Sequence, residues 1–433
     1  MNSFKIALVV SCCGGMLQAA IPEVMSVTMA QRAGSRKVDI TYDLKNADAV
    51  VTLDIQTNSQ DGVWASIGGV ALGEPTGDVG GKVSVGNGKS IVWDARSWPD
   101  QVIEGPNVRA VVTAWPIDSP ADYMTVDIES GAVRFYASTE TLPGGFNHRD
   151  YKTRKLLMRK IPARGKVWRM GSPQRENGRW QIYGGWNLVN EGHETRHLVT
   201  LTNDYYMGVY ECTIWQYEKL GCPSDGEHLV DPKADRDLCP VGCLWGGRLH
   251  GESGPNAALR TKTGIASFDL PTDAQWEFAC RAGSGSALYT GVEIVANAEN
   301  AASLDARVEA IAWYDANSGG YAHEVGTRKP NAFGLYDMIG NVNEECRDFF
   351  SSADAYIGSF GEGYRIGDVV VDPKGCLTNQ GSEDMLYVYR GGGFDSKLCY
   401  CRSAYRSGRN AWSGGQPVSC GVRMSCLAND VVK

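Results

Sequence analysis

The run His193-Glu194-Thr195-Arg196-His197 has the spacing H-E-x-x-H, in which two histidines can bind zinc and the glutamate can polarise a water molecule. This chemistry requires a helix, because a helix brings both histidines to one face. The neighbouring residues predict no helix, since Gly192 directly precedes the run and residues 198–202 alternate in polarity as in a strand. No H-x-x-G-x-x-H pattern follows to supply a third histidine. We therefore interpret the run as a solvated loop and not as a zinc site.

A second candidate is the stretch of residues 331–345, which holds two glycines and several Asn and Asp residues among apolar ones. This composition indicates an ordered loop with special backbone angles. Asp337 and Glu344 offer carboxylate oxygens, and carbonyls between them can complete the oxygen shell of a Ca²⁺ ion. The residues alone leave two interpretations open, a calcium site and a structural loop held by hydrogen bonds.

The C-terminal stretch from Arg390 to Cys426 is dense in Ser, Gly, aromatic, Arg and Cys residues. This composition suits an adaptable binding surface. Cys399 and Cys401 lie on one side of the chain if the backbone is extended, and two thiolates could bind a soft metal ion such as Cu(I). The alternative is that each pairs with a distant cysteine. Arg390-Gly391-Gly392-Gly393 does not indicate RNA binding, because the chain is acidic and the motif is not repeated.

Strand patterns dominate residues 22–116, the first part of the scaffold. Apolar residues alternate with polar ones in several segments, and Asn87-Gly88 predicts a hairpin turn between residues 83–85 and 91–93. We therefore expect an all-β sandwich of roughly immunoglobulin-like size. The alternating apolar positions are Val38, Ile40, Tyr42, Leu44, Val51, Leu53, Ile55, Val108, Ala110, Val112 and Ala114.

Residues 117–122 form a predicted linker, because two prolines and short polar residues resist regular structure around them. Residues 123–433 form a second, longer domain. One helix is predicted within residues 270–283, where Thr272 and Gln275 can form a capping box and Gly283 can end the helix. A second helix is predicted from Ile214 to Leu220. The 52 glycines indicate a loop-rich α+β domain.

The composition is that of a globular, acidic protein. The 433 residues include 42 Lys and Arg against 50 Asp and Glu, a net charge of −8 that argues against a nucleic-acid partner. Residues 1–20 resemble a signal peptide, and no later segment has the length and polarity of a membrane span. We therefore expect an exported protein, whether periplasmic, cell-surface or secreted. Eleven of the 13 cysteines follow the signal segment, and most are expected in disulfides.

Five motifs occur in an order that resembles the formylglycine-generating enzyme, or sulfatase-modifying factor, family, over about residues 155–427. This resemblance implies a variant of the C-type-lectin fold, with a small twisted β core, few helices and much ordered loop. The motifs are Met170-Gly171-Ser172-Pro173, YYMGVYECT from Tyr205, LPTDAQWEFACRAG from Leu270, VGTRKPNAFGLYDMIGNVNEE from Val325, and YRGGGF…CRSAYR…GVR from Tyr389.

The resemblance also implies two metal sites. A family calcium site falls here on Asp337, Gly340, Val342 and Glu344, and each position has a competent oxygen. The family's enzymes bind Cu(I) through two cysteines five residues apart and oxidise a sulfatase cysteine to formylglycine.

The copper positions are only partly matched in this chain. Counted forward from Gly391-Gly392-Gly393, they fall on Ser396 and Cys401, and no two cysteines of this chain are five apart. The motif also lacks the family's serine, and Asn343 replaces a tryptophan near the family's active site. An oxidase would therefore have to use Cys401, Cys399 and Ser396 in another arrangement.

Cys401-Arg402-Ser403-Ala404 is similar to a second branch of the family, the variable ligand-binding proteins of diversity-generating retroelements. The resemblance thus implies two functions from different classes. One is a module that binds a peptide, glycan or protein in a groove formed by residues 391–412. The other is the copper oxidase, with a sulfatase as its partner. The candidate binding residues are Phe394, Asp395, Lys397, Tyr400, Tyr405, Arg406, Trp412 and Asn343.

Overall fold

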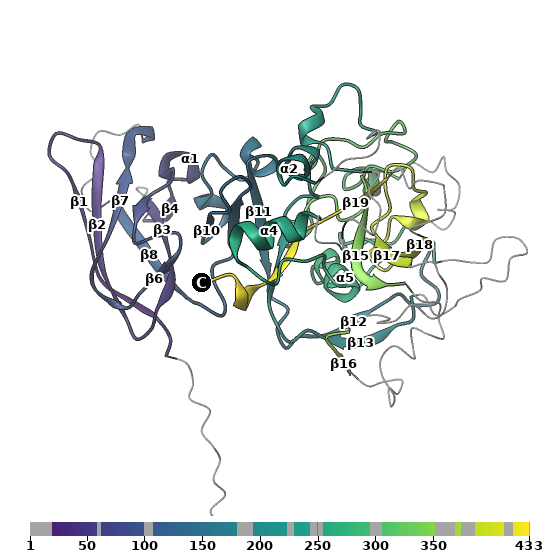
Figure 1. The fold of residues 1–433 in the computed structure, drawn as a ribbon, viewed down its shortest axis with the longest axis horizontal. Helices are drawn as coiled ribbons and strands as arrows, with labels where there is room; N and C mark the ends of the chain where they lie inside the picture. Colours follow the sequence, from purple (N-terminus) through teal and green to yellow (C-terminus); the bar gives the residue numbers. More distant parts are fainter. Residues whose placement is uncertain are drawn as a thin grey trace, which may run out of the picture.

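The computed structural model describes residues 20–58, 62–98, 107–179, 194–222, 229–242, 249, 254–294, 305–350, 369–373, 386–410 and 419–432. A β-sandwich occupies one end of the molecule, and a larger, loop-rich α+β domain follows it (Figure 1). Except for Ala20, the predicted signal peptide lies outside the described residues. No helix of the described residues is long and apolar enough to cross a membrane.

The sandwich consists of two sheets with an apolar core between them. The first has the strand order β1-β2-β7-β5, and in the second β3 pairs with β4, β6 and β8. Val38, Ile40, Tyr42 and Leu44 of β2 are all buried in the core, as their alternation predicts. The strands are β1 (Glu23–Gln31), β2 (Lys37–Lys45), β3 (Ala49–Asn58), β4 (Trp64–Ser66), β5 (Thr76–Gly77), β6 (Lys82–Val83), β7 (Gly86–Asp94) and β8 (Val108–Pro116), with helix α1 (Gly69–Leu72) between β4 and β5.

The hairpin predicted at Asn87-Gly88 is wrong. Both residues lie inside β7, and β6 and β7 belong to different sheets. Between Tyr42 and Leu44 of β2 the register shifts, so that β7 carries one extra residue in a bulge. Gly88 has a φ of +65°, an angle that such bulges and tight hairpins both require. The dipeptide therefore indicated the backbone angle correctly, but not the element that uses it.

The sandwich packs directly against the second domain. Val50 of β3 is buried in a hydrophobic cluster formed mainly by residues of the C-terminal domain, and Trp115 packs against the same cluster. The amide of Phe135 donates to the carbonyl of Gly80 at 2.9 Å. Ala121, within the predicted linker, is fully buried. The two regions therefore share apolar surface, and the connecting segment is packed between them.

The described part of the C-terminal domain contains three sheets. A five-stranded sheet has the order β10-β9-β11-β14-β20, a four-stranded one β18-β17-β15-β19 and a three-stranded one β12-β13-β16. Their strands are β9 (Tyr123–Asp127), β10 (Val133–Tyr136), β11 (Lys155–Ile161), β12 (Val167–Met170), β13 (His197–Thr200), β14 (Tyr205–Gly208), β15 (Asn343–Phe349), β16 (Val369–Val371), β17 (Leu386–Arg390), β18 (Arg406–Asn410), β19 (Cys420–Gly421) and β20 (Ser425–Leu427).

Both helices predicted from the sequence are present. Helix α5 (Asp273–Arg281) begins with the predicted capping box, in which Thr272 and Gln275 each accept a backbone N–H of the other. It ends at Arg281, and the left-handed residue that follows is Ala282, one position before the predicted Gly283. The other described helices are α2 (Ile214–Lys219), α4 (Pro255–Thr263) and α6 (Ala306–Glu309).

Seven buried cysteines of the described residues are free thiols, so they do not form the disulfides expected for an exported protein. They fill space in two hydrophobic clusters, as small apolar side chains do. The seven are Cys212, Cys222, Cys239, Cys280, Cys346, Cys401 and Cys426.

Candidate functional site

The predicted binding segment begins at the end of β17 and leads into β18. Gly391 and Gly392 have φ values of +87° and +71°, which turn the chain sharply. A short 3-10 helix follows over Leu398–Tyr400. The segment is therefore not extended, and alternation cannot tell which of its side chains face solvent.

Two predicted display residues are buried, which corrects the sequence interpretation. Phe394 is only 2% exposed and packs with Ala322 and Val342. Arg406 is 4% exposed and forms an ion pair with Asp273, with 2.8 Å between Nη2 and Oδ2. Their side chains belong to the scaffold, so neither can offer its surface to a ligand in this arrangement.

The other predicted binding residues lie nearer the surface. Asp395 and Lys397 are exposed, while Asn343, Tyr400 and Tyr405 are partly buried. The rings of the two tyrosines lie 4.9 Å apart, and the Asn343 side chain donates to the Ser419 hydroxyl at 3.0 Å. Trp412 lies outside the described residues. The surface available for recognition therefore combines two charged side chains with an aromatic pair.

The three residues predicted for the oxidase interpretation are buried or half-buried. Cys401 is fully buried, and its sulfur packs close to Gly392. Burial raises the pKa of the Cys401 thiol well above its usual range, which disfavours the thiolate that Cu(I) requires. Cys399 is also buried, at 3% exposure, and Ser396 accepts the backbone N–H of Gly393 at 2.8 Å. The residues present thus do not fit a copper ion held by two thiolates.

The side chains that the resemblance implies as calcium ligands, Asp337 and Glu344, contact different groups in the structure. Asp337 is buried with one oxygen accepting the backbone N–H of Gly326 and the other unpaired among the described residues. Glu344, however, uses both oxygens on the Arg423 guanidinium, and the Trp276 indole donates to one of them at 2.6 Å. Because a guanidinium already neutralises Glu344, this side chain does not fit a calcium ligand.

The backbone of the same loop also has other partners. Gly340 donates to the Gly391 carbonyl, and Val342 donates to the buried carboxylate of Glu211 at 3.0 Å. Burial raises the pKa of the Asp337 carboxyl to about 6, and nearby Glu344 adds to this shift. These contacts match the structural-loop interpretation, and calcium stays a prediction of the resemblance.

Three fully buried arginines were missed by the sequence reasoning. Arg390 pairs with Asp273 and with Glu277 at 3.0 Å, and Arg423 pairs with Glu344. A signal was present, because Arg423 stands between Val422 and Met424 in an otherwise apolar run.

Arg402, the third, explains the H-E-x-x-H run. Its Nη2 lies 2.7 Å from Oε1 of Glu194, and its Nη1 lies 2.7 Å from Oε1 of Glu176. Burial raises the pKa of the Glu194 carboxyl, but Arg402 and Ser172 outweigh this effect and bring it to about 2. Glu194 and His197 are each 8% exposed, so the solvated loop predicted there is wrong for both. His193 lies outside the described residues.

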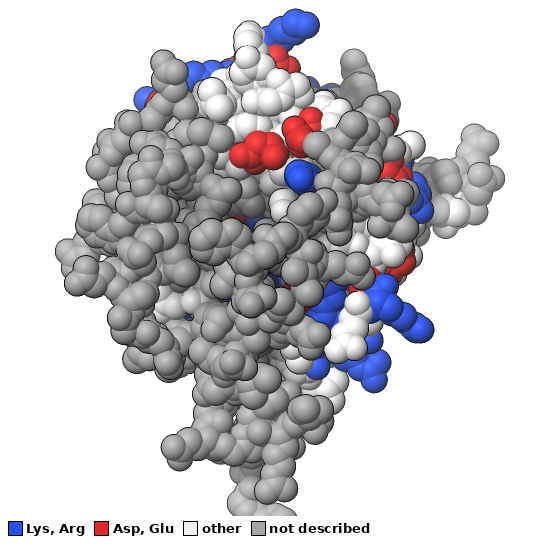
Figure 2. All heavy atoms as spheres, turned by 90° about the vertical axis from the view of Figure 1, so that its right-hand side faces the viewer, with Lys and Arg blue, Asp and Glu red and all other residues white. Residues whose placement is uncertain are grey.

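Figure 2 shows the end of the C-terminal domain that lies away from the sandwich. Between the atoms of residues that are not described, acidic side chains appear in the upper part of this face, and basic side chains appear along its upper edge and at the lower right.

Comparisons with known proteins agree with this architecture. Residues 243–425 match the family model described as a sulfatase-modifying factor enzyme 1-like domain. The formylglycine-generating enzyme of Thermomonospora curvata is 34% identical over 86 residues, which cover 19% of this chain and 28% of that protein. A chaperone protein LppX of Paenibacillus barcinonensis is 30% identical over 105 residues, 20% of this chain and 34% of that protein. The chain thus spans about a third or less of these curated relatives.

Solved structures resemble the chain at low sequence identity. Treponema denticola variable protein 1 has a TM-score of 0.46 and 20% identity, covering 63% of this chain and 95% of that one. PvdO from Pseudomonas aeruginosa has a TM-score of 0.45 and 22% identity, covering 63% and 94%.

The C-terminal domain is thus a loop-rich α+β domain of the sulfatase-modifying-factor type. Residues 243–425 of the chain therefore resemble the sulfatase-modifying factor family, to which the matched domain model belongs.

Proposed function

We propose that this protein is a ligand-binding member of the sulfatase-modifying factor family, and that it does not oxidise a sulfatase cysteine. One observation carries the proposal, the position of Cys401. Its thiol is fully buried beside Gly392, and burial raises its pKa, so that it is neither reachable by a substrate nor ionised near neutral pH. Ser396 supplies a hydroxyl where a second thiolate would be needed.

The same segment retains features that suit binding. Asp395 and Lys397 are exposed, and the Tyr400 and Tyr405 rings of the same segment are partly buried and contact each other. Aromatic side chains offer large contact area at low entropic cost, and the charged pair supplies orientation. Among a peptide, a glycan and a protein, we favour a protein ligand, because one relative bears the name of a chaperone and binding of another protein is the activity that this name describes. We also propose that the protein acts after export.

The proposal is tested first at the thiol. The purified protein is loaded with Cu(I) under O₂ and given a cysteine-containing sulfatase-motif peptide, and the peptide is followed by mass spectrometry. We expect no aldehyde product while a known enzyme of the family converts the peptide in parallel. Conversion that is lost in Cys401→Ala but kept in Cys280→Ala, a matched buried cysteine, would overturn the proposal.

The binding surface is tested separately. Arrays of peptides, glycans and candidate proteins are screened with the wild type, and affinities are then measured by calorimetry. We expect Lys397→Glu and Asp395→Ala to weaken the selected ligand at least about tenfold, or about 1.4 kcal/mol. Lys166→Glu, an exposed change near β12, serves as the control. Binding that ignores both variants would place the recognition surface elsewhere.

A further inference from the structure

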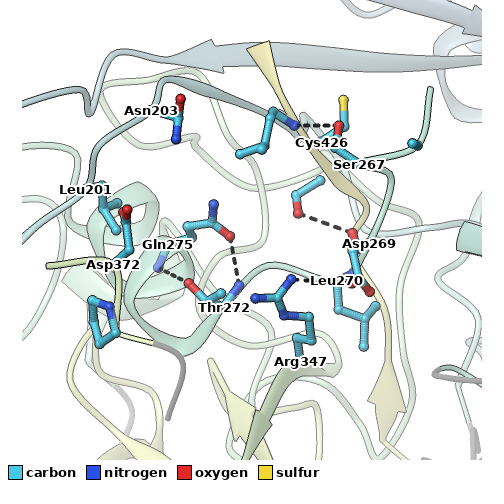
Figure 3. A pocket seen from close by; sticks show the side chains of 14 residues that line it. Leu201, Asn203, Ser267, Asp269, Leu270, Thr272, Gln275, Arg347, Asp372 and Cys426 are labelled. Atoms are coloured by element: carbon cyan, nitrogen blue, oxygen red, sulfur yellow. Dashed lines mark hydrogen bonds and ion pairs between the residues drawn. The ribbon is translucent and has the colours of Figure 1, made fainter. Parts of the chain in front are cut away.

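A pocket of about 360 Å³ opens on another part of the C-terminal domain, away from the binding segment. It lies where the first turn of α5 meets β15, β20 and the residues that follow β13 and β16 (Figure 3). A volume of this size is in the range of small-molecule sites. None of the described residues assigned above to binding, copper or calcium is among those that line it.

One side of the pocket supplies positive charge. Arg347 extends from β15 and is 43% exposed, and its Nη1 lies 3.6 Å from Oδ2 of Asp269. This distance is longer than in a direct guanidinium–carboxylate pair of about 2.8 Å, so most of the guanidinium donors remain open. The amide nitrogen of Gln275 also donates to no group of the described residues, because the capping box uses only the amide oxygen. A carboxylate would find donors on both side chains.

The opposite side supplies negative charge in a fixed position. The carboxylate of Asp372 accepts the backbone N–H of Thr202 at 2.8 Å and also the Thr202 hydroxyl. These bonds orient the carboxylate and leave each oxygen with a second lone pair. In Figure 3, Gln275 lies between Asp372 on one side and Arg347 and Asp269 on the other. The pocket therefore places a cation and a carboxylate across one small space.

The remaining wall combines apolar and polar side chains. Leu201, which follows β13, and Leu427 of β20 line the pocket together with the polar residues Asn203, Ser267, Thr272 and Ser425. Among the residues that the structure describes, no aromatic side chain lines it, so a sugar ring would find no flat surface there to stack on. A simple anion would meet Asp269 and Asp372, and a simple cation would meet Arg347. A ligand that carries a carboxylate, an ammonium and an apolar group on one carbon can contact the arginine, the carboxylate and the two leucines.

We propose that this pocket binds a free α-amino acid with an apolar side chain. The α-carboxylate contacts Arg347 and the Gln275 amide, the α-ammonium contacts Asp372, and the side chain contacts Leu201 and Leu427. This site is independent of the surface around Asp395 and Lys397, so its occupancy does not depend on which function that surface serves.

The probe for calorimetry is L-leucine, titrated into the full-length mature protein. We expect saturable binding with one site per chain. Leucinamide, which lacks the carboxylate, and N-acetyl-leucine, which lacks the ammonium, should each bind at least about tenfold more weakly. Glucose should not bind. The absence of any binding heat up to about 10 mM L-leucine, taken as the weak limit of a specific small-molecule site, would overturn the proposal. Equal affinities for leucinamide and L-leucine would also overturn it.

Two variants assign the site. Arg347→Met and Asp372→Asn should each weaken L-leucine binding at least about tenfold. The matched controls are Arg169→Met and Asp118→Asn, exposed residues outside the pocket, and they should leave binding unchanged. Thermal unfolding of each variant checks that it is folded. Unchanged binding in Arg347→Met would place any leucine site elsewhere and sink the assignment.

Discussion

The two regions of this protein are both rich in strands, yet their interiors differ in kind. The sandwich core is built from aliphatic and aromatic side chains such as Val38, Leu53 and Trp93. Among the residues that the structure describes, every buried charged side chain lies in the C-terminal domain. There Arg390, Arg402 and Arg423 are completely buried in ion pairs.

This difference shows what the motifs of the C-terminal domain accomplish. The arginines belong to the C-terminal motif YRGGGF…CRSAYR…GVR, while Asp273 and Glu277 come from the helix motif and Glu344 from the loop motif. Segments far apart in the chain are thus joined by buried ion pairs between specific side chains. Apolar burial stabilises the sandwich with little demand on partner identity, whereas buried ion pairs demand their own partners.

The largest expected effect is the loss of one such arginine. Arg402→Met would leave the carboxylates of Glu176 and Glu194 buried without their cation and should lower the free energy of unfolding by about 3–5 kcal/mol. Denaturant titration measures the loss, with Arg169→Met, at an exposed arginine, as the control. Adding Glu194→Gln to Arg402→Met should restore part of the stability. A loss below about 1 kcal/mol would mean that the pair is not essential to this core.

A buried substitution in the sandwich should lower the free energy of unfolding through lost packing alone. Leu53→Ala should cost about 2–5 kcal/mol, because it removes apolar contacts and leaves a cavity. Since Leu53 is surrounded by apolar side chains, the loss should be equal at pH 5 and pH 8. Val63→Ala, at a 63% exposed position, is the control. A loss of stability in Leu53→Ala that differed between pH 5 and pH 8 would contradict the view that the sandwich core is purely apolar.

The charged core should instead show a pH dependence to which a single buried carboxyl makes a measurable contribution. Burial raises the pKa of the Asp348 carboxyl to about 7, and neighbouring Asp273 adds to the shift. The unfolded value is about 3.9, so between pH 4 and 7 the folded state keeps a proton that the unfolded state has lost. The free energy of unfolding should therefore fall as pH rises through this window.

Asp348→Asn removes this contribution. Relative to the wild type, the variant should gain roughly 2–4 kcal/mol between pH 4 and pH 8. Urea unfolding at four pH values measures both profiles. Parallel profiles would show that Asp348 does not titrate in this window.

The smallest expected effect concerns the start of α5. Thr272→Ala removes the hydroxyl that accepts the backbone N–H of Gln275, and it should lower the free energy of unfolding by about 1 kcal/mol. Thr272→Ser keeps the hydroxyl and should lower it little. Thermal unfolding distinguishes the two. Equal losses would mean that the methyl group of Thr272, not its cap, stabilises the helix.

Local patterns in the sequence were reliable where a short segment decides its own conformation. The alternation in β2 correctly predicted which residues are buried, because side chains alternate between the two faces of a strand. In β3 the predicted Val51, Leu53 and Ile55 are buried, but Val50 and Thr52 on the other face are buried as well. The capping box of Thr272 and Gln275 correctly predicted where α5 begins, and α2 begins at the predicted Ile214. The ordered motifs predicted the fold family, although the activity they imply stays untested.

The binding segment and the charged core could not be predicted in the same way. Phe394 follows three glycines whose turn directs it inward, and Arg406 turns inward to a carboxylate more than a hundred residues earlier in the chain. The sequence context of Glu194 resembled that of a catalytic residue, but in the structure its carboxylate pairs with Arg402, 208 positions away in the chain. The sequence by itself determined several strands of the sandwich and the beginnings of two helices, since these depend on neighbours along the chain, and its ordered motifs indicated the family that residues 243–425 resemble. Only the tertiary structure decided which charges are buried, which thiols are reachable and where a pocket remains, because those properties arise from contacts between distant segments.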